Sequence, residues 1–336
     1  MKVYTIIFTF CLSICGFNEL KAQDPVYSQF YNSPLELNPA FAGNSYAPTI
    51  SMNYRNQWPS ISSVYETYSA SYDQFLPRYN SGIGLVLFSD NQGNGALKTI
   101  KIGGFYSYHL KLNNKVKIKI GVEASAINSR LDWSRLSFPD QIDAEFGGVS
   151  PGGTPYPTQE IQPDGLGKTY LDLSTGILLN TELFYAGVAL KHVNTPDDSF
   201  IDGGQNFEGL PFRLSMHGGI QINLDEGNKK DLGSFITPNV LFVKQVDFSQ
   251  LNVGAYTGIN RFFLGGWYRH AWGNPDALIF STGVRTGVFK IGYSFDYTVS
   301  ELSVNTGGSH EIGILVNLES VVQKPSELND CLRLFR

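Results

Sequence analysis

The sequence predicts an all-β protein: a transmembrane antiparallel β-barrel of about 14 strands, with short periplasmic turns and long extracellular loops. Apolar residues alternate with polar or small ones at a period of two in many successive runs. Behind the N-terminal 23 residues, no stretch approaches the ~20 consecutive apolar residues that a membrane helix needs. The connections between the runs are short and long in turn, which is typical of bacterial membrane barrels.

Residues 1–23 have the pattern of a secretory signal peptide. Lys2 supplies the positive charge, residues 3–17 are apolar, and Leu20-Lys21-Ala22-Gln23 offers a cleavage site with a small residue. An alternative is lipoprotein processing at Cys15, but the bulky Ile14 before this cysteine fits that enzyme poorly. We therefore expect the mature chain to begin near residue 23 or 24.

The mature chain contains no Pro/Ser-rich linker, so we predict one membrane domain with two flanking segments. Residues 24–47 form an N-terminal plug or periplasmic segment, residues 48–319 form the barrel, and residues 320–336 form a C-terminal periplasmic tail. Cys331 is the only cysteine outside the signal peptide. A disulfide or a cysteine-based metal site within one chain is therefore excluded.

The strands follow from the alternation, which is clearest at 289–297, where aromatic and aliphatic residues face one side and Lys290, Gly292, Ser294 and Asp296 the other. The expected strands are 48–55, 63–75, 82–90, 97–112, 115–128, 168–180, 182–193, 211–224, 232–244, 247–259, 261–271, 276–286, 288–298 and 309–319.

An even number of strands places both ends of the chain on one side, which is the periplasmic side in bacterial barrels. Every second connection is then a periplasmic turn, and most of these are short. The other set contains the two longest connections, 129–167 and 194–210, both rich in Gly, Pro and Asp. The very short connection at Gln245 is an exception to this pattern.

A soluble β-sandwich or propeller would also alternate, and it is the competing fold. It would need no aromatic girdle, whereas tyrosine and phenylalanine gather toward strand ends here, as at Tyr106, Tyr108, Tyr293, Phe295 and Tyr297. Closure into a barrel also removes the exposed edges that an open sheet of this size would have to protect. The outer-membrane lipid is therefore an expected partner.

The chain shows no pattern of an active site, and we predict that it is not an enzyme. Its five histidines are scattered, and none falls in a spacing that would put two ligands on one face. The mild net charge of -5 gives no reason to expect a nucleic-acid partner. We predict no cofactor, although Asp90 to Gly95, and Asp197-Asp198 with Asp202-Gly203-Gly204, have weak resemblance to Ca²⁺-binding loops.

Lumen-facing charges such as Lys117, Lys119, Glu123, Lys290 and Asp296 either pair across the barrel or line a wet channel.

Residues 24–47 are too apolar for a free tail, yet their prolines prevent a regular strand or helix. We predict that this segment plugs the periplasmic mouth, with Asn38-Pro39 as a rigid turn; the alternative is a periplasmic arm that docks a partner. The residues of this plug or docking surface are Tyr27, Phe30, Tyr31, Asn38, Pro39 and Phe41.

Several motifs resemble the PorP/SprF family of the type IX secretion and gliding machinery of Bacteroidota. The opening DPVYSQFYNSPLELNPAFAG at 24–43 resembles the mature N-terminus of that family. Further matches are Tyr54-Arg55-Asn56-Gln57-Trp58, the strand starting at Gly82, the region 127–136, and the ending 291–297, 300–302 and 307–312, which includes Ser309, His310 and Glu311.

This resemblance implies an outer-membrane accessory component of type IX secretion that enables export or surface anchoring of a large adhesin through the C-terminal domain of that adhesin. The machinery would meet the periplasmic side, and the adhesin would meet the loops 129–167 and 194–210. Tyr54, Arg55, Trp58, Ser309, His310 and Glu311 would serve structure or docking. Two alternatives remain open: a passive porin, or a core secretion subunit that every cargo needs.

Overall fold

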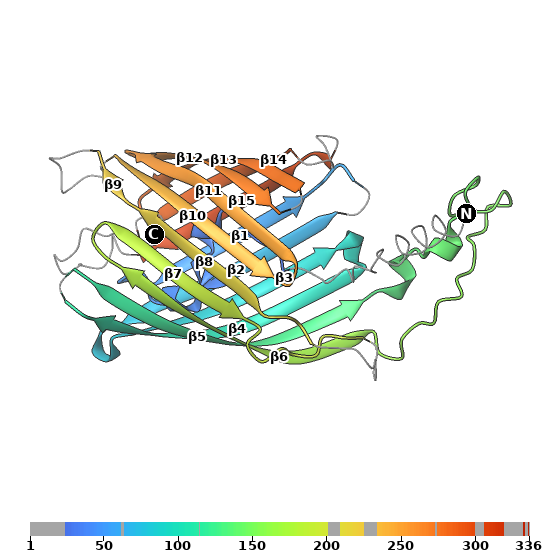
Figure 1. Cartoon of the computed structure of the whole chain (residues 1–336), viewed down its shortest axis with the longest axis horizontal. Helices are drawn as coiled ribbons and strands as arrows, with labels where there is room; N and C mark the ends of the chain where they lie inside the picture. Colours follow the sequence, from blue (N-terminus) through green and yellow to red (C-terminus); the bar gives the residue numbers. More distant parts are fainter. Residues whose placement is uncertain are drawn as a thin grey trace, which may run out of the picture.

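The computed structural model of the chain describes residues 24–61, 64–113, 115–200, 209–224, 234–272, 274–299 and 306–318, together with residues 332 and 335. The described strands form one antiparallel sheet that closes on itself (Figure 1). The predicted signal peptide and most of the predicted tail lie outside the described residues. In the described part, no helix has both the length and the apolar composition needed to cross a membrane.

The wall strands run in chain order around the barrel. They are β1 (Thr49–Gln57), β2 (Tyr65–Leu76), β3 (Ser81–Gln92), β4 (Leu97–Lys111), β5 (Lys117–Leu131), β6 (Gly167–Asn180), β7 (Phe184–Lys191), β8 (Arg213–Ile220), β9 (Ile222–Asn223), β10 (Phe235–Gln245), β11 (Phe248–Ile259), β12 (Phe262–Ala271), β13 (Asn274–Thr286), β14 (Phe289–Thr298) and β15 (Ser309–Asn317).

Pairing of β1 with β15 closes the barrel, from Thr49 opposite Asn317 to Gln57 opposite Ser309. The short β9 continues β8 beyond Gln221, and both pair with the same side of β10. The fifteen strands therefore occupy fourteen positions in the wall. The predicted fourteen-strand antiparallel barrel is confirmed, and the predicted strand 211–224 is the one that is interrupted.

The two faces of the wall differ as a membrane barrel requires. In β4, Lys101, Phe105 and Ser107 are buried toward the lumen, while Ile102 and Tyr106 are exposed on the outside. Exposed aromatic side chains lie near both ends of the strands, as in the girdles at membrane interfaces. They are Tyr79, Tyr106, Tyr108, Phe184, Phe262 and Phe289 near one rim, and Tyr68, Tyr268, Trp272 and Tyr297 near the other.

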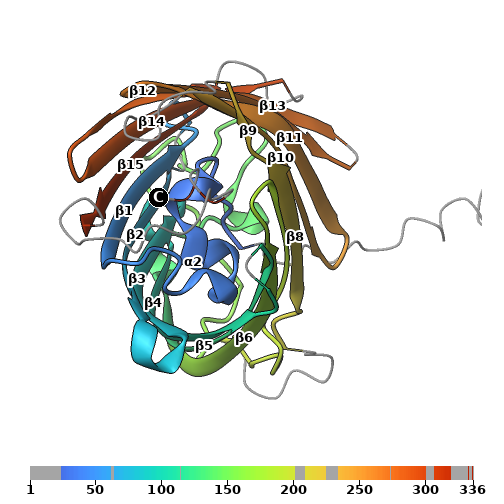
Figure 2. The same cartoon turned by 90° about the vertical axis from the view of Figure 1, so that its left-hand side faces the viewer.

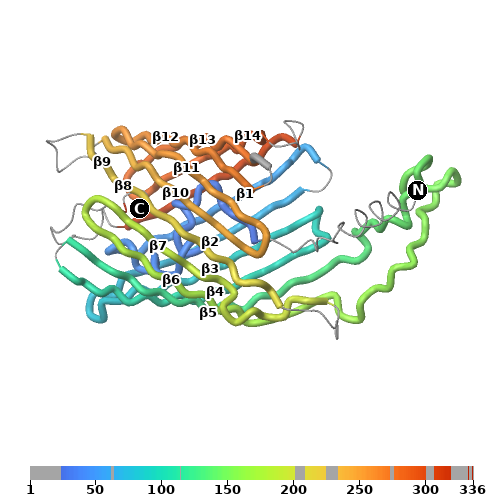
Figure 3. Tube along the Cα trace, in the orientation of Figure 1, coloured from blue at the N-terminus to red at the C-terminus, as the bar shows by residue number. Residues whose placement is uncertain are grey.

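We name the rims by their connections. The short-turn rim holds the start of β1, the end of β15 and the connections 77–80, 112–116 and 181–183. The long-loop rim holds the connections 132–166 and 192–212, and 132–166 projects far beyond it as an extended green arm (Figure 3). The very short connection that the sequence indicates at Gln245, the exception at this rim, lies between β10 and β11, at 246–247.

Candidate functional site

The lumen of the barrel is filled by residues 24–47, which we call the lumen segment. It contains η1 (Phe30–Asn32), α2 (Pro34–Leu37) and η2 (Pro39–Phe41), and these short turns occupy the centre of the barrel in the end view (Figure 2). Proline at the start of α2 and of η2 fits a first helical turn but prevents long helices. None of its residues is exposed.

The lumen segment runs the length of the barrel and does not stay at one mouth. The Asp24 backbone N–H donates to Gln245 Oε1 over 3.2 Å, at the last residue of β10 on the long-loop rim. At its other end, Ser45 Oγ accepts a hydrogen bond from Asn317 Nδ2 over 2.8 Å, at the last residue of β15 on the short-turn rim. The segment thus passes through the lumen before it enters β1, so Asp24 lies at the rim opposite to the end of β15, whereas the sequence predicts the two ends of the chain on the same side.

The six residues predicted for a plug or docking surface all lie in this segment. They are Tyr27, Phe30, Tyr31, Asn38, Pro39 and Phe41, and each is buried. Their role stays a prediction, but their surroundings are now defined by the strands they contact.

An aromatic cluster holds the first part of the segment. The ring of Tyr31 stacks on Trp267 at 5.6 Å and lies 5.3 Å from Tyr256, and Phe30 meets Trp267 edge-on at 6.2 Å. The ammonium of Lys290 lies 5.1 Å above the Tyr31 ring, within the range of a cation–π contact. Side chains from β11, β12 and β14 therefore hold the Tyr31 ring.

Two wall glycines leave room for the second part of the segment. A Cβ atom on Gly121 would lie 2.2 Å from the backbone nitrogen of Ala40, and one on Gly82 would lie 2.0 Å from the carbonyl oxygen of Ala42. Any side chain at these positions would collide with the segment backbone. Gly82 belongs to the predicted family motif, and this close approach is a physical reason for glycine there.

Asn38 binds strands β6 and β7, next to Gly121 on β5. Its Nδ2 group donates to the carbonyl oxygens of Ile177 and Val188, over 3.1 and 3.2 Å, and lies 3.1 Å from Nε2 of His217. Its Oδ1 atom accepts from the Ala40 N–H over 2.9 Å and so caps η2. One side chain thus satisfies wall carbonyls and shapes the segment.

Arg55 and Glu311 of the family motifs meet inside the barrel and hold the start of the segment. Arg55 pairs with Glu311 over 3.2 Å and with Asp296 over 3.1 Å. The Glu311 carboxylate accepts the backbone N–H groups of Ser28 and Gln29, over 2.8 and 2.9 Å. These two motif residues therefore anchor the segment, through partners that sequence reasoning did not identify.

The other motif residues lie elsewhere. Tyr54 points outward, where its hydroxyl donates to Glu66 over 3.0 Å, and Trp58 packs edge-on against Tyr65. His310 is paired with the Tyr293 hydroxyl at 2.7 Å on the outer side. Ser309 is buried at the start of β15. The structure therefore does not bring the six motif residues into one site.

Glu36 is a second anchor, and sequence reasoning missed it. Its carboxylate pairs with Lys101 over 2.8 Å and with Lys191 over 2.9 Å, and Lys101 also pairs with Glu123 over 3.2 Å. Two ammonium groups beside one carboxylate compensate the charge that would otherwise be buried without a partner.

Asp24 forms a third anchor at the long-loop rim. It lies 2.7 Å from His192 Nε2 and 3.5 Å from Arg213, and His192 Nδ1 lies 3.0 Å from Asp172. Burial would lower the pKa of His192, but the two carboxylates outweigh burial and raise the pKa to about 9. The imidazole, just beyond β7, is therefore positively charged at neutral pH.

The predicted C-terminal tail contributes to the short-turn rim. Phe335 is buried against Phe41, with the ring centres 4.5 Å apart, and meets Tyr185 edge-on at 5.2 Å. Leu332 is buried as well. The rest of the tail, including Cys331, lies outside the described residues.

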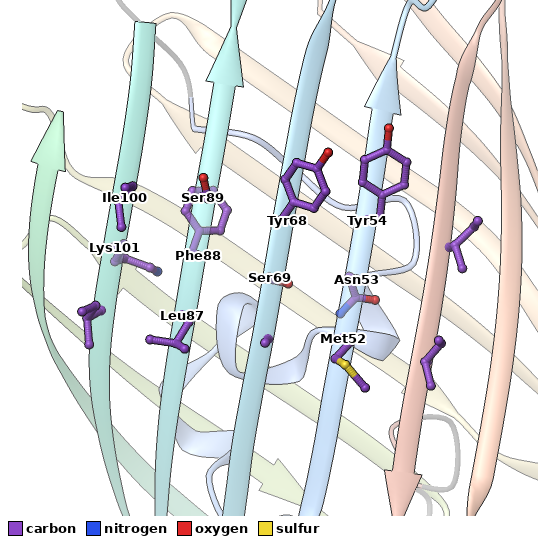
Figure 4. A pocket seen from close by; sticks show the side chains of 14 residues that line it. Met52, Asn53, Tyr54, Tyr68, Ser69, Leu87, Phe88, Ser89, Ile100 and Lys101 are labelled. Atoms are coloured by element: carbon purple, nitrogen blue, oxygen red, sulfur yellow. The ribbon is translucent and has the colours of Figure 1, made fainter. Parts of the chain in front are cut away.

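The described part also has hollows outside the volume that the lumen segment fills. One of about 580 Å³ lies on the outer wall, where Met52, Tyr54, Tyr68 and Leu87 surround it (Figure 4). Its lining is apolar, as expected for a surface in contact with lipid. Another, of about 140 Å³, lies inside the barrel at the long-loop rim beside Asp24 and His192.

The weak Ca²⁺ sites stay untested predictions. Asp90 accepts a hydrogen bond from Thr67, and Asp197 pairs with Lys168. Residues 202–204 lie outside the described part. Within the described part, no three His, Cys, Asp or Glu side chains are grouped in a way that could hold a metal ion.

A family model described as "Type IX secretion system membrane protein PorP/SprF" matches residues 19–316. The chain belongs to the PorP/SprF family. The match covers the lumen segment and the barrel wall except for its last residue, and it confirms the resemblance drawn from the sequence motifs. No curated protein matches the sequence.

Several solved barrels are similar in shape. The toluene transporter TodX of Pseudomonas putida aligns with a TM-score of 0.49 at 12% identity, over 85% of this chain and 92% of that chain. The toluene transporter TbuX of Ralstonia pickettii gives 0.46 at 10% identity, over 85% and 92%. The outer membrane protein Omp33 of Acinetobacter baumannii gives 0.42 at 10%, over 81% and 97%. Similarity at this level concerns barrel shape and not ligands or partners.

The PorP/SprF assignment indicates in which membrane system the barrel and its lumen segment work. This chain is a membrane protein of the type IX secretion system, and the family together with the closed barrel supports a location in the outer membrane. The side that each rim faces stays a prediction.

Proposed function

We propose that this PorP/SprF protein is a non-enzymatic docking component of the outer membrane, which enables export or surface anchoring of a large adhesin through the adhesin's C-terminal domain. In this proposal the short-turn rim faces the periplasm and the secretion machinery, and the long-loop rim faces the adhesin. The family assignment supports the secretion role. The filled lumen is the observation that favours docking over conduction.

The physical argument concerns what removal of the segment would require. Exit of the lumen segment would separate Glu36 from two buried lysines and Glu311 from two backbone N–H groups. Buried charges that lose their partners are costly. Passage of a solute or of a folded domain through the barrel would first have to overcome this cost, so the rims are better suited to contact a partner.

Deletion of the gene, followed by mass spectrometry of the culture medium and of the cell surface, tests the proposal. We expect loss of one large adhesin from the surface, with other secreted proteins unchanged. Loss of all type IX cargo would instead identify a core subunit. Single-channel conductance of the purified wild-type barrel without any partner would favour the porin alternative.

A further inference from the structure

The wall has an open strand edge at the long-loop rim. Strand β6 pairs with β5 along its whole length, from Gly167 opposite Arg130 to Asn180 opposite Lys117. It pairs with β7 only over residues 175–180, because β7 ends at Lys191. Eight residues of β6, 167–174, therefore extend past β7, a length of about 26 Å at the usual rise of a strand.

The direction of the backbone groups along this edge follows from the pairing. The Leu131 N–H donates to the Leu166 carbonyl, so even-numbered residues of β6 bond to β5. The odd-numbered residues then present their N–H and C=O groups to the missing neighbour. Among the described residues, none bonds the backbone N–H or C=O groups of Gly167 and Thr169.

Farther along this edge, Val193 and Asn194 bond the open backbone groups of β6. Asn194 folds back so that its side-chain amide imitates a strand: Oδ1 accepts the Leu173 N–H over 2.9 Å and Nδ2 donates to the Leu171 carbonyl over 2.8 Å. Val193 N–H donates to the Leu173 carbonyl over 2.9 Å. These contacts stop at Leu171, and the edge beyond it is a template for another strand.

Open backbone groups also place this edge relative to the membrane. An N–H or C=O group without a partner is costly in hydrocarbon, because no water is present to bond it. Residues 167–171 must therefore stand above the hydrocarbon layer, in water. A protein partner can reach them there, whereas lipid tails cannot.

The arm at 132–166, which joins β5 to β6, is continuous with this edge. It contains six carboxylates and one arginine, a net charge of -5 that equals the net charge of the whole 336-residue chain. The other residues of the chain thus sum to zero. A partner of opposite charge is favoured at this arm.

The arm also exposes apolar surface. No residue from 131 to 171 is buried, although local hydrogen bonds such as Asp143 to Gly147 shape the arm. Several of its apolar side chains are exposed, with Ile161 at 88% exposure, Ile142 at 60% and Phe146 at 50%. Leu171 on the open edge is 70% exposed. Apolar groups gathered on a projecting arm without a core indicate a protein-binding surface.

We propose that the β6 edge at residues 167–171 and the acidic arm bind an extended, cationic β-strand of the secreted partner, which adds to the wall as a new strand. Backbone hydrogen bonds to Gly167 and Thr169 supply affinity, and the arm selects a strand that combines basic and apolar residues. This inference rests on the proposed function, because it takes the secreted adhesin as the owner of the strand.

Proline substitution on the two sides of β6 tests the strand addition. Thr169→Pro removes an N–H that faces the open edge, and proline is tolerated where a strand N–H has no partner. Tyr170→Pro is the folding control, because it removes an N–H that bonds β5, and it should prevent assembly of the heat-modifiable barrel. Thr169→Ala keeps the backbone donor. The variants are expressed in the gene-deletion strain, and adhesin on the surface is measured.

We expect Thr169→Pro to assemble normally and to retain about tenfold less adhesin, the equivalent of about 1.4 kcal/mol, while Thr169→Ala behaves as the wild type. Normal retention by an assembled Thr169→Pro barrel would overturn the inference while gene deletion still causes a defect. If gene deletion has no effect, the proposed function itself fails. The two failures are therefore distinguishable.

A second set of variants tests the partner's chemistry and identity. The triple change Glu145→Gln, Glu160→Gln and Asp164→Asn removes three of the six carboxylates of the arm. We expect weaker retention that depends less on salt concentration, and unchanged retention would overturn the cationic assignment. A disulfide-linked homodimer of Thr169→Cys, in a Cys331→Ser background, would show that a second copy occupies the edge and would overturn the proposal.

Discussion

Replacement of Glu36 by glutamine should release the lumen segment without damage to the barrel wall. In the native protein the carboxylate bridges Lys101 and Lys191, and its side chain is only 12% exposed. Glutamine has nearly the same shape but no charge. Lys101 keeps Glu123 at 3.2 Å, whereas Lys191 loses its carboxylate partner while it remains buried. The penalty therefore falls on the contact between segment and wall.

Removal of one partner from a buried ion pair costs about 3–5 kcal/mol, and the retained Lys101–Glu123 pair places this case near the lower value. A loss of about 3 kcal/mol raises the population of the released segment by about 150-fold. Hydrogen exchange at the backbone amides of residues 35–41, measured by mass spectrometry in detergent, should accelerate by the same factor. Exchange in the β-strands should remain slow.

Two controls make the reasoning about Glu36 refutable. Glu160→Gln on the exposed arm removes the same charge and should leave exchange unchanged. Lys191→Met combined with Glu36→Gln removes the unpaired cation and should restore part of the protection. Equal exchange in Glu36→Gln and wild type would refute the view that this ion pair retains the segment.

Three further predictions concern the other anchors. The positive charge on His192 stabilises the Asp24 anchor fully at pH values below the unfolded pKa of 6.5, and this stabilisation is lost as the pH rises through the folded pKa of about 9. Trp267 fluorescence should therefore report loosening of the lumen segment between pH 7 and 10. The variant His192→Gln should not show that step. Gly121→Ala places a Cβ atom 2.2 Å from the Ala40 nitrogen and should displace the lumen segment, which faster hydrogen exchange at the amides of η2 would detect. In Gly104→Ala the nearest atom to the added Cβ lies 3.9 Å away, so hydrogen exchange at η2 should be unchanged. Phe335→Ala empties a buried aromatic site at the short-turn rim, at a cost of about 3 kcal/mol, and should make the C-terminus sensitive to carboxypeptidase; equal digestion of variant and wild type would contradict this.

The wall was predictable because strand pairing in a barrel follows a local rule. The alternation between lipid-facing and lumen-facing side chains can be read from neighbouring residues, and each strand pairs with the next one in the chain. The errors in the predicted strands are local as well. The strand expected at 182–193 ends at Lys191, because His192 adopts a left-handed backbone with φ of 58°. The prediction had no signal for this reversal.

The anchors of the lumen segment could not be predicted, because they join residues that are distant in the sequence. The Ser28 N–H bonds Glu311, 283 residues away, and no periodicity relates two such positions. Lys119 and Asp296 were recognised as lumen-facing charges, but the sequence could not show that their partners would be Asn44 of the segment and Arg55 of the wall. Only the fold brings these groups together.

The arrangement of charge divides the molecule into two working regions. Inside the barrel, ion pairs and hydrogen bonds tie the lumen segment to the wall at Asp24, Glu36 and Glu311, so this region is consistent with a stable closure. Outside, the arm at 132–166 carries a charge of -5 and has no buried residue. An arm without buried residues gains most from an external partner. If conduction were the role, the charges would line an open lumen; their pairing inside and their accumulation on the arm favour recognition at the long-loop rim.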